Sequence, residues 1–328
     1  MTAPTFFIAG AQKAGTTSLH AMLAKHPNVF MSTPKEPGYF IRGFDDQERW
    51  QTMKRPGPDG TIQDLSQVDM GVFTEQAYAA MFASRAAQLA THRGDASTPY
   101  FPSPNAARRI RETVPNARII IALRDPVARA YSAWGYNSSR GNERALTFEE
   151  AVDEELSGGR DDWVYGWRYL YTGLYSQHLQ RYLDAFGDER ILLLKFEDFR
   201  ADSQAVFDRI CQFLEIPAAE VQSGDRENVT VQHKNKTLGA IRNGFNRPSL
   251  VKSMVKPLLS PGLRRSVSRS VTQFVDRFAD RPERLSEEMR DRLNAYFLED
   301  CRKLQSMVPF DISDWSPLAA KYSGGAHG

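Results

Sequence analysis

The 328-residue sequence contains 42 Lys and Arg residues against 40 Asp and Glu, and 41% of its residues are hydrophobic and 11% aromatic. This composition excludes a membrane-embedded protein and a disordered one, and no stretch approaches the roughly 18 apolar residues that span a bilayer. No charged region precedes the first short apolar run, so we expect no signal peptide. With only Cys211 and Cys301, we exclude a disulfide scaffold and expect two half-buried thiols in a reducing, cytoplasmic compartment.

The charged residues are unevenly distributed along the chain. Nine basic residues and no Asp or Glu occur between residues 228 and 275, here called the basic segment. They are Lys234, Lys236, Arg242, Arg247, Lys252, Lys256, Arg264, Arg265 and Arg269. The rest of the chain has 33 basic and 40 acidic residues, a net charge of −7. A basic segment on an acidic body predicts an anionic partner close to it.

Strand and helix patterns alternate along the chain. Short apolar runs predict buried strands at residues 5–9, 29–31, 118–123 and 190–196. Amphipathic stretches predict helices at residues 16–26, 104–113, 173–186, 203–214 and 286–304, with a further helix starting at Pro126. This alternation predicts an α/β fold, a doubly wound parallel sheet with helices on both faces. We expect a single domain over residues 1–328, with residues 45–68 as a surface loop.

A glycine-containing segment from Gly10 to Thr17 lies between the first predicted strand and helix. Gly10 and Gly15 have the spacing of the G-x-x-x-x-G-K-[ST] phosphate loop, but Thr16 occupies the lysine position and Lys13 lies inside the loop. Glycines allow the backbone to wrap an anion, and free N–H groups at a helix start point toward it. The segment therefore predicts an anion site, and the displaced lysine counts against an NTPase.

On these residues the sequence resembles the sulfotransferases that use 3′-phosphoadenosine 5′-phosphosulfate (PAPS). The run QKAGTTSL is similar to the loop with which that family holds the 5′-phosphosulfate. The resemblance is closer to the heparan-sulfate-type and related bacterial branch than to the cytosolic steroid and phenol branch. It implies a P-loop-like fold, with PAPS as sulfuryl donor and adenosine 3′,5′-bisphosphate (PAP) as product. In this loop it implies binding by Lys13, Ala14, Gly15, Thr16 and Thr17.

A second motif follows the apolar run at residues 118–123. Arg124 comes directly after the strand, where open α/β sheets bind ligands, and Ser132 lies eight residues further on, in the next helix. Arginine can bind a phosphate through two parallel hydrogen bonds, and serine adds a neutral donor. The resemblance assigns Arg124 and Ser132 to the 3′-phosphate of PAPS. Asp125 could instead bind magnesium, as in an NTPase, but its position before Pro126 favours a helix cap.

The third motif is a turn in which Lys35 and Glu36 stand between Pro34 and Pro37. The two prolines stiffen the turn, which suits a carboxylate that must be positioned accurately. Sulfuryl transfer to a hydroxyl requires a base for the acceptor proton and a cation near the leaving phosphate. By resemblance, Glu36 is the catalytic base. Gly38 stands where the heparan-sulfate-type branch often has histidine, which affects the expected acceptor contacts.

The segment from Gly94 to Phe101 resembles a family segment of acid, lysine, small hydroxyl residue, proline and tyrosine. Ala96 replaces the lysine, a change that bears on the acceptor pocket. Asp95 and Tyr100 have two interpretations: they line the acceptor pocket, or they are a strand-end acid and a packed tyrosine.

Through this resemblance, the motifs together imply a PAPS-dependent sulfotransferase, which we expect to act by direct in-line transfer without a metal. Lys13 would stabilise charge on the phosphate leaving group, and Glu36 would accept the acceptor proton. The predicted acceptor is a hydroxyl, or an amine, of a carbohydrate, glycolipid or small molecule. Two alternatives remain open: a P-loop kinase or NTPase, and a non-catalytic nucleotide-binding protein of the same fold.

The basic segment has several interpretations. It could cover PAPS, bind an acidic acceptor, associate peripherally with an anionic membrane surface, or form a solvated basic face. In the heparan-sulfate-type branch a lysine-glycine-arginine loop closes over the nucleotide here, and neither Lys234 nor Lys236 can be assigned to that role. The resemblance implies a carbohydrate or lipid-linked acceptor. No nucleic-acid recognition module is present and the net charge is small, so we expect no nucleic-acid partner.

Overall fold

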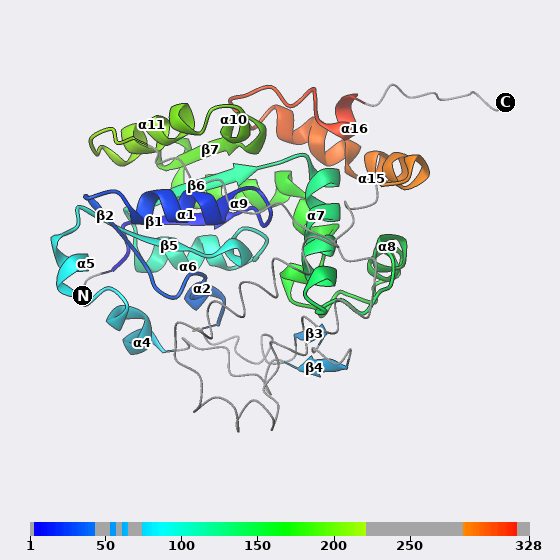
Figure 1. The fold of residues 1–328 in the computed structure, drawn as a ribbon, viewed down its shortest axis with the longest axis horizontal. Coiled ribbons are helices and arrows are strands. Elements are labelled where there is room, and N and C mark those ends of the chain that lie inside the picture. The colour runs from blue at the N-terminus through cyan, green and yellow to red at the C-terminus, as the bar shows by residue number, and fades with distance from the viewer. Residues whose placement is uncertain (1–2, 43–52, 57–60, 65–73, 221–284, 320–328) are drawn as a thin grey trace, which may run out of the picture.

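The computed structural model describes residues 3–42, 53–56, 61–64, 74–220 and 285–319, which surround a five-stranded sheet (Figure 1). The strand order is β2-β5-β1-β6-β7, and every neighbouring pair is parallel. The strands are β1 (Phe6–Gly10), β2 (Val29–Met31), β5 (His92–Ala96), β6 (Arg118–Leu123) and β7 (Ile191–Lys195). Because all strands run the same way, the loops that follow them leave one edge of the sheet.

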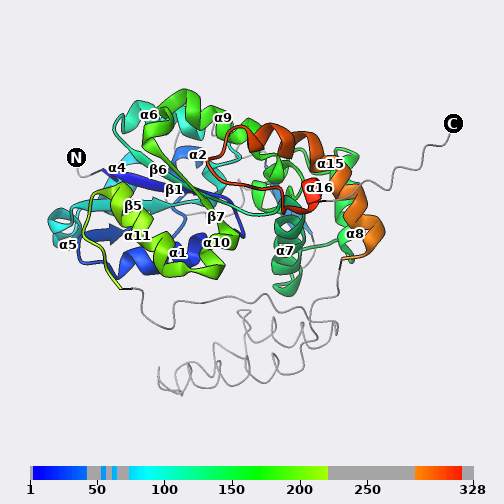
Figure 2. The ribbon, with the colours of Figure 1, turned by 90° about the horizontal axis from the view of Figure 1, so that it is seen from above.

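Helices cover both faces of this sheet (Figure 2). On one face lie α6 (Ala106–Thr113) and α9 (Tyr175–Phe186), and on the other lie α1 (Thr16–Ala24) and α11 (Ser203–Leu214). The other helices are α2 (Tyr39–Arg42), α4 (Glu75–Ala80), α5 (Arg85–Leu89), α7 (Pro126–Ser139), α8 (Phe148–Leu156), α10 (Phe196–Ala201), α15 (Glu287–Gln305) and α16 (Ser316–Ala319). The predicted doubly wound parallel sheet is confirmed.

The core is built on the central strands β1 and β6. Phe6, Phe7 and Ile8 of β1 are fully buried, and the isoleucines of β6 are buried beside them. Removing a large apolar side chain from water stabilises the fold by about 1.5–3 kcal/mol, so the apolar run of each strand explains why it forms at the sheet centre. Register then pairs Ile8 with Ile120 on one side and with Ala96 on the other.

Strand β5 was not among the strands predicted from apolar runs, because its sequence HRGDA lacks one; it agrees with the interpretation of Asp95 as a strand-end acid. It is held by its neighbours: β2 and β1 pair with it on either side. A Cβ atom on Gly94 would lie 2.3 Å from Cζ of Phe6 and 2.5 Å from Sδ of Met31. Any larger residue at this position would clash with the side chains of Phe6 and Met31, which pack against the backbone of Gly94. Tertiary pairing overrides the weak local preference.

Element ends follow local chemistry. Asp125 caps α7, as predicted: its carboxylate accepts the backbone N–H of Ala128 at 2.8 Å and of Ser316 at 2.5 Å. Helix α9 begins two residues later than predicted, because Gly173 belongs to a preceding 3-10 turn. Cys211 and Cys301 are free thiols, and both are fully buried rather than half-buried.

Two predicted segments fall largely outside the described residues. The basic segment, residues 228–275, lies wholly outside them, and residues 45–68 are described only in part. That part contains β3 (Lys54–Pro56) and β4 (Ile62–Asp64), which pair as an antiparallel two-stranded sheet. Within the described ranges, no helix is both long and apolar enough to cross a membrane.

Candidate active site

The loop between β1 and α1 lies at the edge where the parallel strands end. Gly15 caps α1 with φ +86°, a left-handed conformation that glycine adopts without strain. A Cβ atom here would also lie 3.2 Å from the ring of Phe196, which packs against the loop. Thr16 is the first residue of the helix and is buried, whereas Thr17 is exposed. The loop therefore presents the positive end of α1 to the space beside it.

Lys13 extends from the middle of this loop. Its backbone has φ +69°, which is uncommon for a residue with a side chain. The Nζ atom lies 4.3 Å from the ring centroid of Tyr136 on α7. The pKa of Lys13 is lowered to about 8, mainly by burial and in addition by the positive charges of Arg140 and Arg124. This ammonium group is therefore partly desolvated and lies among other cations, as expected where an anion binds.

Arg124 and Ser132 converge on the same space. Arg124 follows β6 and donates from Nη1 to the backbone carbonyl of Lys13 at 3.1 Å, and its guanidinium lies 4.8 Å from the ring centroid of Phe196. Among the described residues no carboxylate forms an ion pair with Arg124, and burial lowers the pKa of its guanidinium. A half-buried arginine without an ion pair retains donors for an anionic ligand.

Glu36 reaches the site from the turn after β2. It also has a left-handed backbone, with φ +60°, and its N–H donates to the carbonyl of Ala96 at 3.1 Å. Lys35 Nζ and Thr98 Oγ1 both donate to Oε1 of Glu36 at 2.9 Å. Within the described part of the chain, no donor contacts Oε2. The carboxylate is thus oriented through one oxygen, and the other remains available to a substrate.

These groups line a cavity of about 220 Å³, here called the first cavity. Its lining residues are Gln12, Lys13, Gly15, Thr16, Thr17, Ser18, Glu36, Thr98, Arg124, Ser132, Tyr136 and Phe196. Every residue predicted for the site is among them except Ala14, which is buried in the core and donates its N–H to the carbonyl of Ala11. Asp95 and Tyr100 line neither this cavity nor the adjoining one.

A second cavity, of about 420 Å³, adjoins the first. The two share Gln12, Glu36, Thr98 and Tyr136, so the Glu36 carboxylate stands at their junction. The other lining residues are Ala11, Arg55, Pro99, Phe101, Pro102, Asn137, Arg140, Asn142, Val164, Tyr165, Gly166, Trp167 and Thr172. Aromatic rings, amides and two guanidinium groups make this surface suitable for a polar, ring-containing molecule.

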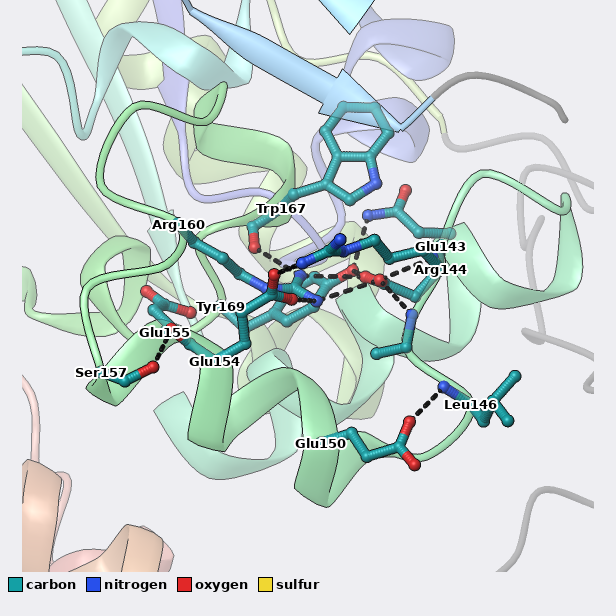
Figure 3. A network of polar contacts seen from close by, with 12 residues as sticks. Glu143, Arg144, Leu146, Glu150, Glu154, Glu155, Ser157, Arg160, Trp167 and Tyr169 are labelled. Atoms are coloured by element: carbon teal, nitrogen blue, oxygen red, sulfur yellow. Dashed lines mark hydrogen bonds and ion pairs between the residues drawn. The ribbon is translucent and has the colours of Figure 1, made fainter. Parts of the chain in front are cut away.

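The wall of the second cavity is held by a buried polar network (Figure 3). Arg160 and Glu143, whose side chains are 0% exposed, form a bidentate pair with both N···O distances at 3.0 Å. Arg160 also donates to the carbonyl of Trp167 at 3.1 Å, and Trp167 Nε1 donates to the carbonyl of Asn142 at 2.6 Å. Tyr169 donates to Glu143 at 2.5 Å. These bonds tie the loop after α7 to the loop before α9.

Sequence reasoning missed Thr98 and Tyr136, which line both cavities. A signal for Tyr136 was available, because Ser132, Tyr136 and Arg140 are spaced at four-residue intervals and so lie on one face of α7. The Tyr136 ring contacts Lys13 as described, and the Arg140 guanidinium lies 3.7 Å from its centroid. Thr98 lies in the Gly94–Phe101 segment that resembles the family, but nothing in the sequence indicated that its hydroxyl reaches Glu36 from a different strand end.

Taken together, the first cavity offers several donors and two cations to an anion, with a carboxylate at its junction with the second cavity. Such an arrangement can hold a doubly phosphorylated molecule and place a base next to a second substrate.

Residues 4–220 match the family model described as "Sulfotransferase family". The chain is 27% identical over 219 residues to the bifunctional heparan sulfate N-deacetylase/N-sulfotransferase 4 of Mus musculus, covering 64% of this chain and 22% of that protein. It is 29% identical over 218 residues to the bifunctional heparan sulfate N-deacetylase/N-sulfotransferase 2 of Homo sapiens, covering 65% and 22%. The chain thus spans about a fifth of the length of these relatives.

A solved structure extends the similarity across the chain. The crystal structure of a sulfotransferase from Alicyclobacillus acidocaldarius has 27% sequence identity and a TM-score of 0.66, covering 95% of this chain and 98% of the other. The predicted fold and the predicted resemblance are both confirmed. Because the family match covers more than half of its residues, the chain belongs to the sulfotransferase family.

Proposed function

We propose that this sulfotransferase moves the sulfuryl group of PAPS to a hydroxyl or amine of a carbohydrate, glycolipid or small-molecule acceptor. The observation that carries the proposal is the first cavity, where the Lys13 loop, Arg124 with Ser132, and Glu36 come together. The kinase or NTPase alternative is not favoured, because Thr16 stands where an NTPase has its lysine, and both oxygens of Asp125 accept backbone N–H groups.

The residues of the first cavity fit PAPS. Lys13, Gly15, Thr16 and Thr17, at the start of α1, would hold the 5′-phosphosulfate, with the Ala14 backbone completing the loop. Arg124 and Ser132 would hold the 3′-phosphate. Support comes from two partly desolvated cations, Lys13 and Arg124, neither of which forms an ion pair within the described residues. The charges of Glu197 and Asp125 offset the burial of Arg124 only in part. PAPS supplies an activated sulfuryl group, and PAP would be the product.

The chain's own residues would then act on the acceptor. Lys13 would stabilise negative charge on the leaving phosphate, and Glu36 would accept the proton of the acceptor through its available oxygen. The second cavity would hold the acceptor, because it meets the first cavity at Glu36. A carbohydrate agrees with its aromatic and amide lining and with the heparan sulfate named in the relatives.

The first prediction concerns nucleotide choice. PAP should raise the Tm of the protein more than ATP or AMP does, because only PAP offers a 3′-phosphate to Arg124. Arg124→Ala should weaken PAP binding about 10- to 150-fold, the cost of one charge-assisted contact. Thermal shift and isothermal titration calorimetry would measure both effects.

Arg108→Ala is the matched control, because Arg108 is exposed on α6 and pairs with Glu112. It should leave PAP binding unchanged. Equal stabilisation by PAP, ATP and AMP, or a Mg²⁺ requirement for binding, would contradict the proposal.

The second prediction separates proton transfer from acceptor binding. Glu36→Gln keeps the side-chain shape but removes the base, so kcat should fall by roughly two to four orders of magnitude while the Kd for PAP changes little. Trp167→Ala should instead raise the acceptor KM, because Trp167 lines the second cavity and not the first. Steady-state kinetics on both variants would test this division. A kcat for Glu36→Gln within a few-fold of wild type would exclude Glu36 as the base.

The third prediction follows from the lowered pKa of Lys13. Burial and two cationic neighbours bring that pKa to about 8, so the free enzyme loses this positive charge as the pH rises through 8. PAP affinity should therefore be highest below this pH and decrease above it. Arg140→Gln removes one neighbouring cation and should move the decrease to higher pH.

Titrations of PAP between about pH 7 and 9.5 would measure the shift, above the second ionisation of the phosphate. Arg144→Gln is the control, because Arg144 pairs with Glu154 and does not affect Lys13. If the affinity profiles of wild type and Arg140→Gln coincide, Arg140 does not set the pKa of Lys13.

The fourth prediction concerns the basic segment. We expect a cytoplasmic enzyme that associates through this segment with an anionic lipid surface or an acidic acceptor. Nine basic residues without an acidic one would attract such a partner. Salt screens this attraction, with a Debye length of about 8 Å at physiological ionic strength. Replacing Lys252, Lys256, Arg264 and Arg265 with Gln should weaken vesicle or acceptor association at low salt and much less at high salt. Liposome co-sedimentation and acceptor KM at two salt concentrations would measure this, and no change in either would leave a solvated basic face.

A further inference from the structure

Asp95, at the end of β5, is a buried carboxylate to which the proposed chemistry assigns no task. Its side chain is 0% exposed and lines neither cavity. Three hydroxyl groups donate to it: Ser97 Oγ at 2.7 Å, and Tyr78 Oη and Tyr100 Oη at 2.8 Å each. A carboxylate buried in this way requires several strong donors to offset its lost hydration, so the cluster has a defined geometry.

Two of these hydroxyl groups also contact the turn that carries Glu36 and the start of α2, which directly follows it. The backbone N–H of Gly38 donates to Ser97 Oγ at 3.2 Å, and that of Phe40 donates to Tyr100 Oη at 3.4 Å. A hydroxyl has one hydrogen to donate and lone pairs to accept. Because Asp95 takes the hydrogen of each hydroxyl, their lone pairs are left for the turn. The carboxylate thus determines which way both groups face.

The turn requires such support. Glu36 has φ +60° and Gly38 has φ +66°, and a left-handed backbone at a residue with a side chain costs of order 1–3 kcal/mol. Pro37, between them, has no N–H with which to anchor the chain. The Glu36 N–H also donates to the backbone carbonyl of Ala96, the residue after Asp95. The residues at the end of β5 therefore support this turn through hydrogen bonds.

We propose that Asp95 is a positioning residue for Glu36, holding the base-bearing turn through the hydroxyl groups of Ser97 and Tyr100. This inference rests on the proposed role of Glu36. Burial raises the pKa of Asp95 to about 6, while the three hydroxyl donors oppose that rise and the charge of Glu36 adds to it. These donors keep the accepting, ionised form at neutral pH, which is the form that the arrangement uses.

Asp95→Asn tests the inference in the full-length enzyme. The amide keeps the shape but offers one accepting oxygen and an N–H₂ donor in place of two accepting oxygens, so a hydroxyl group must turn away from its present bond. We expect kcat to fall about 10- to 100-fold, the usual cost of losing a group that orients a catalytic side chain. The Kd for PAP and the acceptor KM should stay within about two-fold of wild type, since Lys13, Arg124 and the second cavity are unchanged.

A pair of tyrosine variants controls for stability. Tyr100→Phe and Tyr78→Phe each remove one hydrogen bond to the same buried carboxylate, but of the two only the Tyr100 hydroxyl also accepts the Phe40 N–H, at the start of α2 directly after the turn. Tyr100→Phe should lower kcat several-fold more than Tyr78→Phe, even where both lower the Tm equally. Equal loss of kcat in the two variants would overturn the inference, and this comparison remains decisive if Asp95→Asn does not fold.

The double variant Glu36→Gln/Asp95→Asn identifies the route of the effect. If Asp95 acts through Glu36, adding Asp95→Asn to Glu36→Gln should cause no further loss of kcat. The same fold-loss in both backgrounds would show a general structural role and overturn the inference. A near-normal kcat in Glu36→Gln alone would instead overturn the proposed function, so the two failures are distinguishable.

Discussion

The parallel pairing of β1 with β5 on one side and β6 on the other is the constraint on which the site depends. It aligns Ile8 with Ala96 and Ile120, so three chain segments leave the sheet at the same edge. The Lys13 loop follows β1, and Arg124 follows β6. Thr98 follows β5, and the end of β5 also supports the turn that carries Glu36. Groups more than one hundred residues apart in sequence, such as Lys13 and Arg124, thereby reach hydrogen-bond distance. The buried aromatic and aliphatic side chains of β1 stabilise this alignment.

The two residues proposed to act on the reacting groups, Lys13 and Glu36, both have a left-handed backbone. Such strain persists only where surrounding structure compensates for it. For Lys13 the compensation comes from the α1 start and the contacts with Arg124 and Tyr136. For Glu36 it comes from Ala96, Thr98 and the hydroxyl groups oriented by Asp95. A rigid sheet edge thus holds side chains where a flexible loop would not.

Sequence reasoning predicted features that depend on local chemistry. The apolar runs of β1 and β6, the glycine spacing of the anion loop and the Asp125 cap each carry their own signal, and strand ends predict where Arg124 points. Features that depend on tertiary contacts were not predictable in this way. Strand β5 is polar and forms because its neighbours pair with it. The contacts made by Thr98 and by the Asp95 carboxylate can be recognised only once β5 is known to lie beside β1. The second cavity is built by loops that a buried Arg160–Glu143 pair brings together.

The central claim is that the first cavity binds an adenosine bisphosphate in one orientation. A crystal structure of the protein with PAP tests it most directly. The account predicts the 3′-phosphate on Arg124 and Ser132, the 5′-phosphate on the loop of Lys13, Gly15, Thr16 and Thr17, and the Glu36 carboxylate facing the space beyond the 5′-phosphate. PAP bound in the reverse orientation, or outside this cavity, would contradict it.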